Sequence, residues 1–345
     1  MKTRNRFLDI CKFIAIFLVV FGHCIQYGQG IDFLENELYY DNLIFKIIYS
    51  FHMPLFMIIS GYLFSYSIKR NNSSTIIKNK FKQLVVPLFF WGLISTFVVV
   101  ISRIINKTEL SFIFIIKELI VNFICGPWFL WAVWWCSVIV VIVYKYFKNS
   151  PIVFVLGLVL TFVLPDIYGL DMYKYMYPYF IIAYYFGYYN LYDKYKNVNH
   201  FIRCIIIVLY IFSLKFYDNE MYIYISGYSI LGENVLNQLY IDFYRFYIGL
   251  IGSAAILILI SYLYIIINDK IKNLFAYMGK NSLGIYLISD YVNTYLLQKI
   301  TYSCSGYSFL RMLVEAIAVI VICLTINNLF KRNKVLNRCL LGGRI

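Results

Sequence analysis

Apolar runs of about twenty residues recur along almost the whole chain. A helix of that length crosses the hydrocarbon core of a bilayer, and a helix satisfies every backbone hydrogen bond within itself, as lipid requires. Only 14% of the residues are charged, compared with about 25% in soluble domains. The sequence therefore predicts an all-α, polytopic integral membrane bundle that forms one domain over residues 1–345. We expect ten spans, at about 8–27, 43–66, 83–103, 121–144, 150–165, 175–191, 201–217, 240–267, 275–298 and 309–330.

Two segments and the cysteines give further expectations about the fold. The stretch 218–239, which contains MYIYISGYSILG, is expected to form a re-entrant or interfacial segment. The first apolar run is followed by GHCIQYGQG rather than by a small-residue cleavage site, so we expect it to remain as a membrane anchor. The eight cysteines are scattered, without a C-x-x-C pair, and this argues against a disulfide framework or a metal site.

The net charge of +14 mainly reflects how the chain is oriented in the membrane. Most of the 31 basic residues fall on one side of the expected bundle, among them Lys2, Arg4, Lys194, Lys196 and Arg344. Lysine and arginine are enriched in cytoplasmic loops, so this bias predicts that both termini are cytoplasmic and argues against a nucleic-acid partner. The remaining excess of positive charge suits an anionic ligand on the cytoplasmic side.

An ionisable side chain lies deep in the first apolar run. His23 follows FIAIFLVVFG, and Lys12 precedes it by eleven positions. Eleven residues make almost three helical turns, so the two side chains share a helix face about 16 Å apart along the axis. Ionisable groups at bilayer depth are costly and usually functional. The pattern predicts a site that receives a ligand from the cytoplasmic side.

A second histidine matches the first in depth. His23 lies about 22 Å from the inner start of the first span, and His52 about 13 Å from the outer start of the second. In a core about 30 Å thick these positions nearly coincide, so we expect both imidazoles in one cavity that leans outward. The plainer alternative is that each histidine satisfies a backbone carbonyl between packed helices.

Basic and acidic residues near the inner ends of the spans could support such a site. Asp9 and Lys12 are spaced to pair along one helix, or they form an ordinary interfacial pair. Close to the start of the third span, Lys78, Lys80 and Lys82 predict a patch for phosphate groups, although cytoplasmic lysines are also expected from topology alone.

Other positions carry weaker signals. Ser60 precedes Gly61 two turns after Pro54, where small residues allow close helix approach. Trp128 opens the fourth span, either as an interfacial anchor or as a surface for a sugar ring. Asn281 and Ser282 resemble a helix start that faces the cytoplasm, and helix N-termini favour anions. Two acids lie within later spans: Asp290 and Glu315 could serve a proton path or pair with Arg245 or Arg311.

Five motifs resemble the membrane acyltransferase-3 family, in the order in which that family has them. They are RFLDICKFIAIFLVVFGH, SFHMPLFMIISGYLF, FKQLVVPLFFW, GPWFL and GKNSLGIYLIS. The first contains the family's pattern of a basic residue, ten residues and a histidine, here Lys12 and His23. The matches run from about residue 4 to residue 290, and ten spans with cytoplasmic termini also fit the family. The chain is most similar to the sugar O-acetylase branch.

This resemblance implies an O-acyltransferase of the bacterial inner membrane. The acyl donor would be acetyl-CoA or another acyl-CoA on the cytoplasmic side, and the acceptor a hydroxyl of a glycan at the outer side. By position, His23 carries the family's essential histidine and Lys12 its basic partner. Together with the residue pattern, this leads us to expect His23 as the base or acyl carrier with His52 beside the thioester, and the donor's phosphates near Lys12, Lys78, Lys80 and Lys82. No metal is expected.

Two departures from the family pattern stand out. The late motif often ends in histidine, where this chain has Ser289. The start of the third helix is usually rich in arginine, whereas here it carries lysines, which keep the charge but lose the bidentate fork.

Two other classes of protein share the polytopic pattern. A transporter or flippase for a lipid-linked sugar or a small anion would also bury ionisable groups, but we detect none of the internal symmetry common in transporters. A non-catalytic assembly or sensor protein would need no depth-matched histidines. Dependence on acyl-CoA would separate the enzyme from both.

Overall fold

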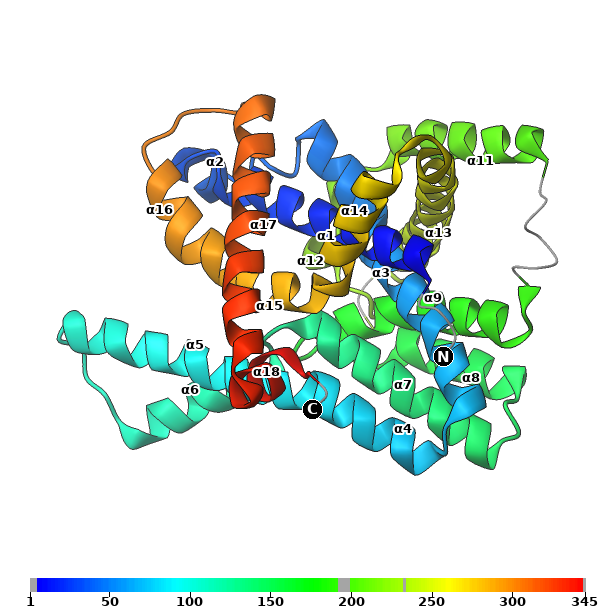
Figure 1. Cartoon of the computed structure of the whole chain (residues 1–345), viewed down its shortest axis with the longest axis horizontal. Helices are drawn as coiled ribbons and strands as arrows, with labels where there is room; N and C mark the ends of the chain where they lie inside the picture. Colours follow the sequence, from blue (N-terminus) through cyan, green and yellow to red (C-terminus); the bar gives the residue numbers. More distant parts are fainter. Residues whose placement is uncertain (1–4, 192–198, 232–233, 344–345) are drawn as a thin grey trace.

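The computed structural model describes residues 5–191, 199–231 and 234–343, and in these ranges it contains helices but no strand. The basic residues Lys2, Arg4, Lys194, Lys196 and Arg344 lie outside the described residues. The helices form a single bundle, in which α5 and α6 project to one side as a hairpin (Figure 1). The chain is thus an all-α membrane bundle, as the apolar runs predicted.

Six helical segments are long and apolar enough to cross a membrane. They are α1 (Arg6–Tyr27), α3 (Leu43–Arg70), the continuous run Ser73–Ile105, α7 (Trp128–Tyr146), α13 (Val235–Ile266) and α17 (Phe309–Arg332). The run Ser73–Ile105 contains α4 (Ser73–Lys80), a π-helical turn over Phe81–Val85, and α5 (Val86–Ile105).

The other four expected spans correspond to helices that are shorter, interrupted or less apolar. The fifth, sixth and seventh become α8 (Pro151–Val163), α9 (Leu170–Tyr188) and α11 (His200–Ser213). The ninth is not one helix, because the chain breaks at Asn281 between α14 (Asp269–Lys280) and α15 (Ser282–Val292). The number of ten spans therefore stays a prediction.

The remaining helical elements are short. They are α2 (Ile31–Glu35), α6 (Phe112–Ile124), the 3₁₀ turns Leu214–Phe216 and Asn219–Met221, α12 (Ile223–Ser226), a second π turn at Asn293–Leu297, α16 (Gln298–Thr301) and α18 (Lys334–Leu341). The described residues of the expected re-entrant stretch 218–239 contain one 3₁₀ turn and α12, and its last residues already belong to α13.

Helix α1 lies at the centre of one half of the bundle, where it contacts α3, α14, α15 and α17. The contact with α14 depends on a small residue, since a Cβ at Gly279 would fall 1.7 Å from the carbonyl oxygen of Asp9. The contact of α3 with α9 is equally close at Gly61, where a Cβ would lie 2.3 Å from the carbonyl oxygen of Phe180. Small residues let membrane helices approach in this way, and the expected role of Gly61 is confirmed.

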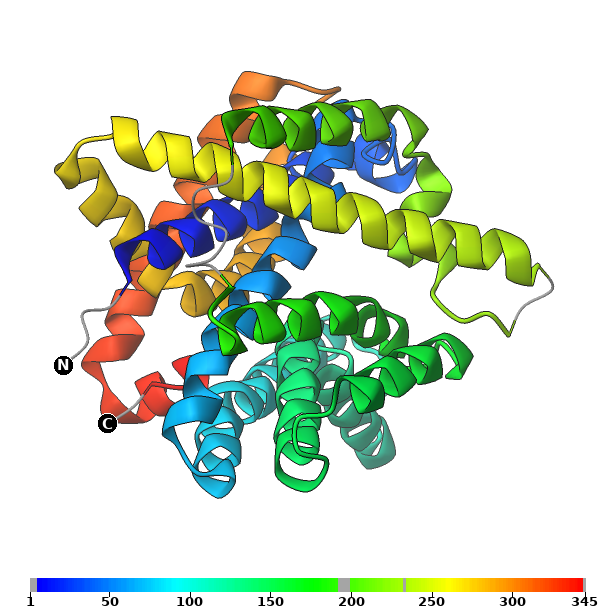
Figure 2. The same cartoon turned by 90° about the vertical axis from the view of Figure 1, so that its right-hand side faces the viewer.

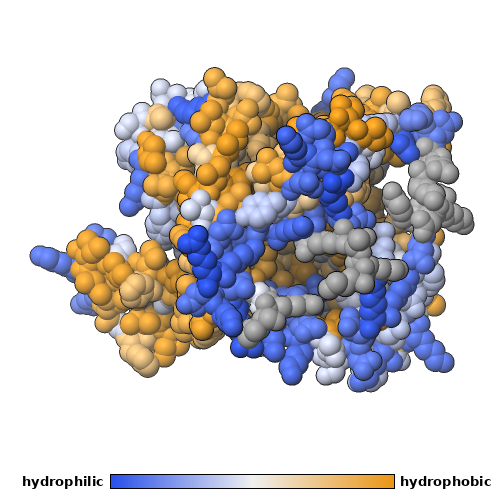
Figure 3. Space-filling view, in the orientation of Figure 1, coloured by the Kyte–Doolittle hydropathy of each residue, from blue (hydrophilic) through white to orange (hydrophobic). Residues whose placement is uncertain are grey.

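Both ends of the described chain lie on one side of the molecule. In Figure 2 the first turn of α1, the whole of α14 and α18 are all at the left. In the orientation of Figure 1, hydrophilic side chains gather around a hollow at the centre of the visible face, while apolar side chains cover the hairpin of α5 and α6 (Figure 3). This arrangement agrees with termini on a common side of the membrane and a lipid-facing flank.

Candidate active site

A cavity of about 500 Å³ lies between α1, α3, α15, the start of α7 and the segment that contains α12. Both His23 and His52 line it, so we call it the histidine cavity. The two imidazoles thus lie in one cavity, as their matched depths in two antiparallel helices predicted. Trp128, the first residue of α7, lines the same cavity.

The ring of His52 is buried and has a defined orientation. Its Nδ1 lies 2.8 Å from the carbonyl oxygen of Ile48, one turn earlier in α3. A carbonyl can only accept a hydrogen bond, so Nδ1 carries the proton and donates it. In the neutral ring Nε2 is then the nitrogen with the free lone pair. This carbonyl contact is the one that the plainer explanation of a buried histidine predicted, but it leaves the second nitrogen available for chemistry.

His23 is half-buried and stacks against Tyr27, with ring centroids 6.0 Å apart. Its Nδ1 is buried and accepts or donates no hydrogen bond to a described residue. Gln26 and Asp290 line the same cavity. The sequence showed that Asp290 is an unusual acid within a span. It lines the same cavity as His23 only because α15 packs against α1.

Aromatic side chains make up much of the remaining wall. Tyrosines come from α1, α3, α12 and α15, and they include Tyr27, Tyr49, Tyr224 and Tyr286. Aromatic walls with a few convergent polar groups are typical of small-ligand sites. Tyr224 could not be predicted, because nothing in the local sequence separates it from the chain's other 34 tyrosines.

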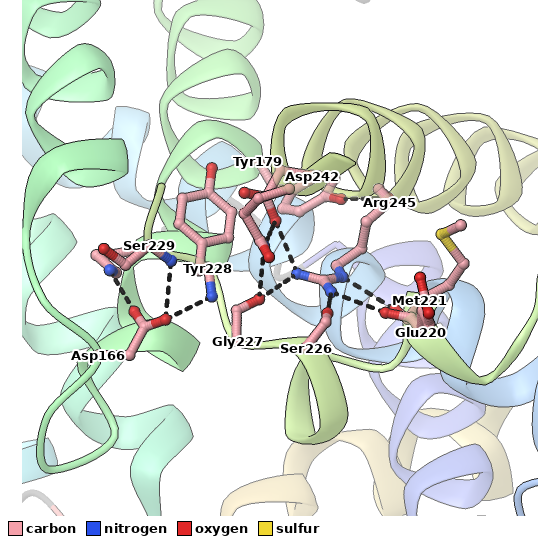
Figure 4. Close-up of polar contacts among 12 residues, drawn as sticks. Asp166, Tyr179, Glu220, Met221, Ser226, Gly227, Tyr228, Ser229, Asp242 and Arg245 are labelled. Atoms are coloured by element: carbon pink, nitrogen blue, oxygen red, sulfur yellow. Dashed lines mark hydrogen bonds and ion pairs between the residues drawn. The ribbon is translucent and has the colours of Figure 1, made fainter. Parts of the chain in front are cut away.

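The position of Tyr224 depends on a buried arginine of α13. The guanidinium of Arg245 pairs with Asp242 at 2.9 Å and donates to the carbonyl oxygens of Met221 and Gly227, each at 2.9 Å (Figure 4). It also donates to the hydroxyl of Ser226. One side chain thus holds the backbone on both sides of α12, and the pairing of Arg245 is with Asp242 rather than with Glu315.

The far end of the same segment is held by a carboxylate. Asp166, in the loop after α8, accepts hydrogen bonds from the backbone N–H groups of Tyr228 at 2.7 Å and Ser229 at 2.8 Å, and it pairs with Lys174 (Figure 4). Burial alone would raise the pKa of Asp166, but the bonds from Lys174 and the two N–H groups outweigh it and hold the pKa below its ordinary value. The carboxylate stays ionised and stabilises the loop.

A second cavity, of about 240 Å³, lies next to the first, toward the N-terminal end of α1. Lys12 and Lys80 line it together with Ser60 and Ser282, and we call it the lysine cavity. Its shared wall with the histidine cavity consists of Val19, Met53 and Tyr286, which line both. Four residues that the sequence marked for separate reasons therefore line one cavity, and that cavity adjoins the one lined by the two histidines.

The other two lysines that were expected to bind phosphate groups lie outside this cavity. Lys78 and Lys82 are exposed, whereas the ammonium of Lys80 lies 5.4 Å from the ring centre of Phe64. The reason is helical periodicity: side chains two residues apart point in nearly opposite directions. Asp9 is buried and lies 3.9 Å from Lys12, as the spacing predicted.

Asn281 has a structural role. It is buried, and its amide oxygen accepts hydrogen bonds from Asn327 at 2.8 Å and from Lys331. Its amide nitrogen donates to the carbonyl oxygen of Tyr277 at 2.8 Å. Helix α15 does begin at Ser282, as expected, but Asn281 joins the break before it to α17 instead of facing a cavity. The other buried acid, Glu315, lies 3.6 Å from Arg311.

Residues 5–332 match the family model described as an acyltransferase domain. The nodulation protein NolL of Mesorhizobium japonicum is 30% identical over 190 residues, which are 54% of this chain and 49% of that protein. NolL of Sinorhizobium fredii is 35% identical over 133 residues, 38% of this chain and 34% of that protein. The chain thus aligns with half or less of these relatives, and no solved structure matches it.

Proposed function

The chain belongs to the acyltransferase-3 family, and we propose that it moves an acetyl or other short acyl group from cytoplasmic acyl-CoA to a hydroxyl of a glycan at the outer face of a bacterial cytoplasmic membrane. Membership makes it a multi-pass membrane acyltransferase. The observation that carries the finer proposal is the pair of adjoining cavities, one with two lysines and the other with two histidines.

The donor's charge and shape fit the lysine cavity. Lysine binds phosphate as a point charge, and Lys12 and Lys80 come from different helices to one cavity. The thioester at the far end of an extended pantetheine arm would then lie beyond Val19 and Met53, next to the imidazoles. Lys78 and Lys82, on the exposed side of the same helical run, would meet only those phosphates that remain outside.

His23 is the proposed general base. It takes the proton of the acceptor hydroxyl as the hydroxyl oxygen attacks the thioester carbon, the C–S bond breaks, and the proton passes on to the leaving sulfur to give free CoA. Asp290, which lines the same cavity, would stabilise the imidazolium that forms. The alternative is a covalent relay, in which an imidazole nitrogen first takes the acyl group. His52, with Nδ1 held by Ile48, offers Nε2 to the same space.

The test is acyl transfer in membranes that contain the full-length protein and radiolabelled acetyl-CoA. We expect His23→Ala to lower the label transferred to glycan by about a hundredfold or more, the usual contribution of a general base. His200→Ala is the matched control, because His200 is exposed and bonds to Tyr262 at 2.9 Å, away from both cavities. Full activity in His23→Ala, with both variants inserted equally, would refute the assignment.

A further inference from the structure

The two cavities differ in charge as well as in position. The lysine cavity is lined by two lysines and by no acid, whereas the histidine cavity is lined by Asp290 and by no lysine or arginine, counting only described residues. The nearby Arg245 is not available to the histidine cavity, because it is buried against Asp242 and the carbonyls of its own segment. An anion would find a counter-charge in the first cavity and none in the second.

Asp290 decides the sign of the histidine cavity in its reactive form. If His23 is the base, it must be neutral when the acceptor arrives, and so must the Nδ1-protonated ring of His52. The amino end of α7 contributes about half of a positive charge, which is less than the full charge of the carboxylate. A second anion here would be desolvated without a partner and repelled by Asp290.

The aromatic wall suits a ligand of the opposite kind. A sugar ring has apolar C–H faces and hydroxyl groups at its edge. Rings such as those of Tyr49, Tyr224 and Trp128 can cover the faces, and the polar groups Gln26 and Asp290 can accept from the edge. Such a site gains nothing from a carboxylate or phosphate on the ring.

We propose that the acceptor is an uncharged sugar ring, and that the histidine cavity excludes sugars with a carboxylate or phosphate beside the reacting hydroxyl. This inference rests on the proposed function, since it concerns the acceptor of that reaction. It adds a specificity-determining residue, Asp290, which acts by its charge on the choice of acceptor.

Cys125 offers a direct probe of the cavity's charge. It is a free, exposed cysteine that lines the histidine cavity. In proteoliposomes with the full chain, Cys125 would be labelled with two thiosulfonate reagents of similar size, a cationic ethyltrimethylammonium and an anionic ethylsulfonate. Peptide mass spectrometry identifies the labelled site, and Cys125→Ser gives the background from the other cysteines. The ratio of the two rates, divided by the ratio for a free thiol, is independent of the ionisation of Cys125 itself.

We expect Cys125 to favour the cationic reagent at least tenfold beyond the free thiol, and we expect Asp290→Asn to remove most of that preference. A ratio equal to that of the free thiol, or one that Asp290→Asn leaves unchanged, would overturn the proposal. So would failure of both reagents to reach Cys125, because the cavity would then be closed to any ligand of sugar size.

A second measurement addresses the acceptor. Methyl glycosides of glucose, galactose and mannose would each be compared with the matching uronate and with the uronate methyl ester, using radiolabelled acetyl-CoA. The neutral glycoside and the ester should be acetylated at least tenfold faster than the uronate. Equal use of uronate and ester would refute the proposal. If no glycoside is acetylated, it is the transfer reaction that fails in this assay, and the Cys125 ratio still decides the charge preference.

Discussion

Lys12 and His23 lie on one face of α1 but line different cavities. Their spacing of eleven positions sets this separation, because α1 passes along both cavities and places Val19 at the wall that they share. Helical periodicity alone therefore allowed Lys12 and His23 to be predicted on one face of α1. Asp290 and Tyr224 could not be assigned to the site in this way, since their places depend on how α15 and α12 fold against α1.

Substitution of Lys12 tests the proposed binding site for the phosphates of acyl-CoA. We expect Lys12→Met to raise KM for acyl-CoA by about tenfold or more while kcat changes little, because a lost bond to a charged group costs about 1.5–3 kcal/mol and acts on ground state and transition state alike. Lys80→Met should behave in the same way. Steady-state kinetics at saturating acceptor would measure both.

Lys78→Met is the matched control for this prediction. Lys78 has the same charge and lies one half-turn from Lys80, but it is exposed and outside both cavities. Its KM should stay within about twofold of the wild-type value, as is usual when a surface charge is removed. If Lys78→Met raised KM as much as Lys12→Met does, the donor's phosphates would bind instead at the exposed face of α4.

Two elements differ from what the sequence suggested, and in each case tertiary contacts are the reason. The helix start at Ser282 was visible in the local sequence, but the break between α14 and α15 depends on Gly279 against α1 and on Asn281 against α17. The segment before α13 was expected to be interfacial or re-entrant. Its actual conformation is set by Arg245, whose partners are mostly backbone carbonyls that no side-chain pattern reveals.

The segment around α12 should loosen when its central anchor is removed. Arg245→Met leaves Asp242 buried without its partner and frees the carbonyls of Met221 and Gly227. We expect a loss of about 3–5 kcal/mol in stability, as for other broken buried pairs, together with faster hydrogen exchange over residues 219–231. Thermal unfolding and exchange mass spectrometry of the purified protein would measure these effects.

An exposed ion pair provides the comparison. Arg6 pairs with Asp269 at 2.8 Å, but Asp269 is 74% exposed, so Arg6→Met should cost no more than about 1 kcal/mol. Unchanged exchange over residues 219–231 in Arg245→Met would show that the segment is held by its other contacts, such as those of Asp166.

At the scale of the whole molecule, the proposed reaction joins two sides of a membrane. The start of α1 and α18 lie together on one side (Figure 2), and the lysine cavity adjoins the histidine cavity along α1. The positive-inside bias predicts that the lysine-bearing side faces the cytoplasm. The number of crossings could not be fixed from the sequence, because apolar runs such as 201–217 and 275–298 form short or broken helices.

Reporter fusions would test this orientation. Green fluorescent protein joined after Ile345 should fluoresce, since it does so only in the cytoplasm, and alkaline phosphatase at the same place should be inactive. Alkaline phosphatase inserted after Tyr307, in the loop before α17, should be active because that loop is expected on the outer side. The opposite pattern would invert the assigned sides of both cavities.

The wall made by Val19, Met53 and Tyr286 has a consequence for the cell's energy supply. A protein that is open to a ligand on each face risks becoming a leak for protons and sodium ions, which would dissipate the membrane potential. Narrow apolar constrictions resist wetting and so block hydrated ions. A thioester arm can slide past such side chains, whereas an ion would have to shed its water to follow. In the proposed reaction, the three residues between donor and acceptor would thus keep the membrane electrically sealed while an acyl group passes through it.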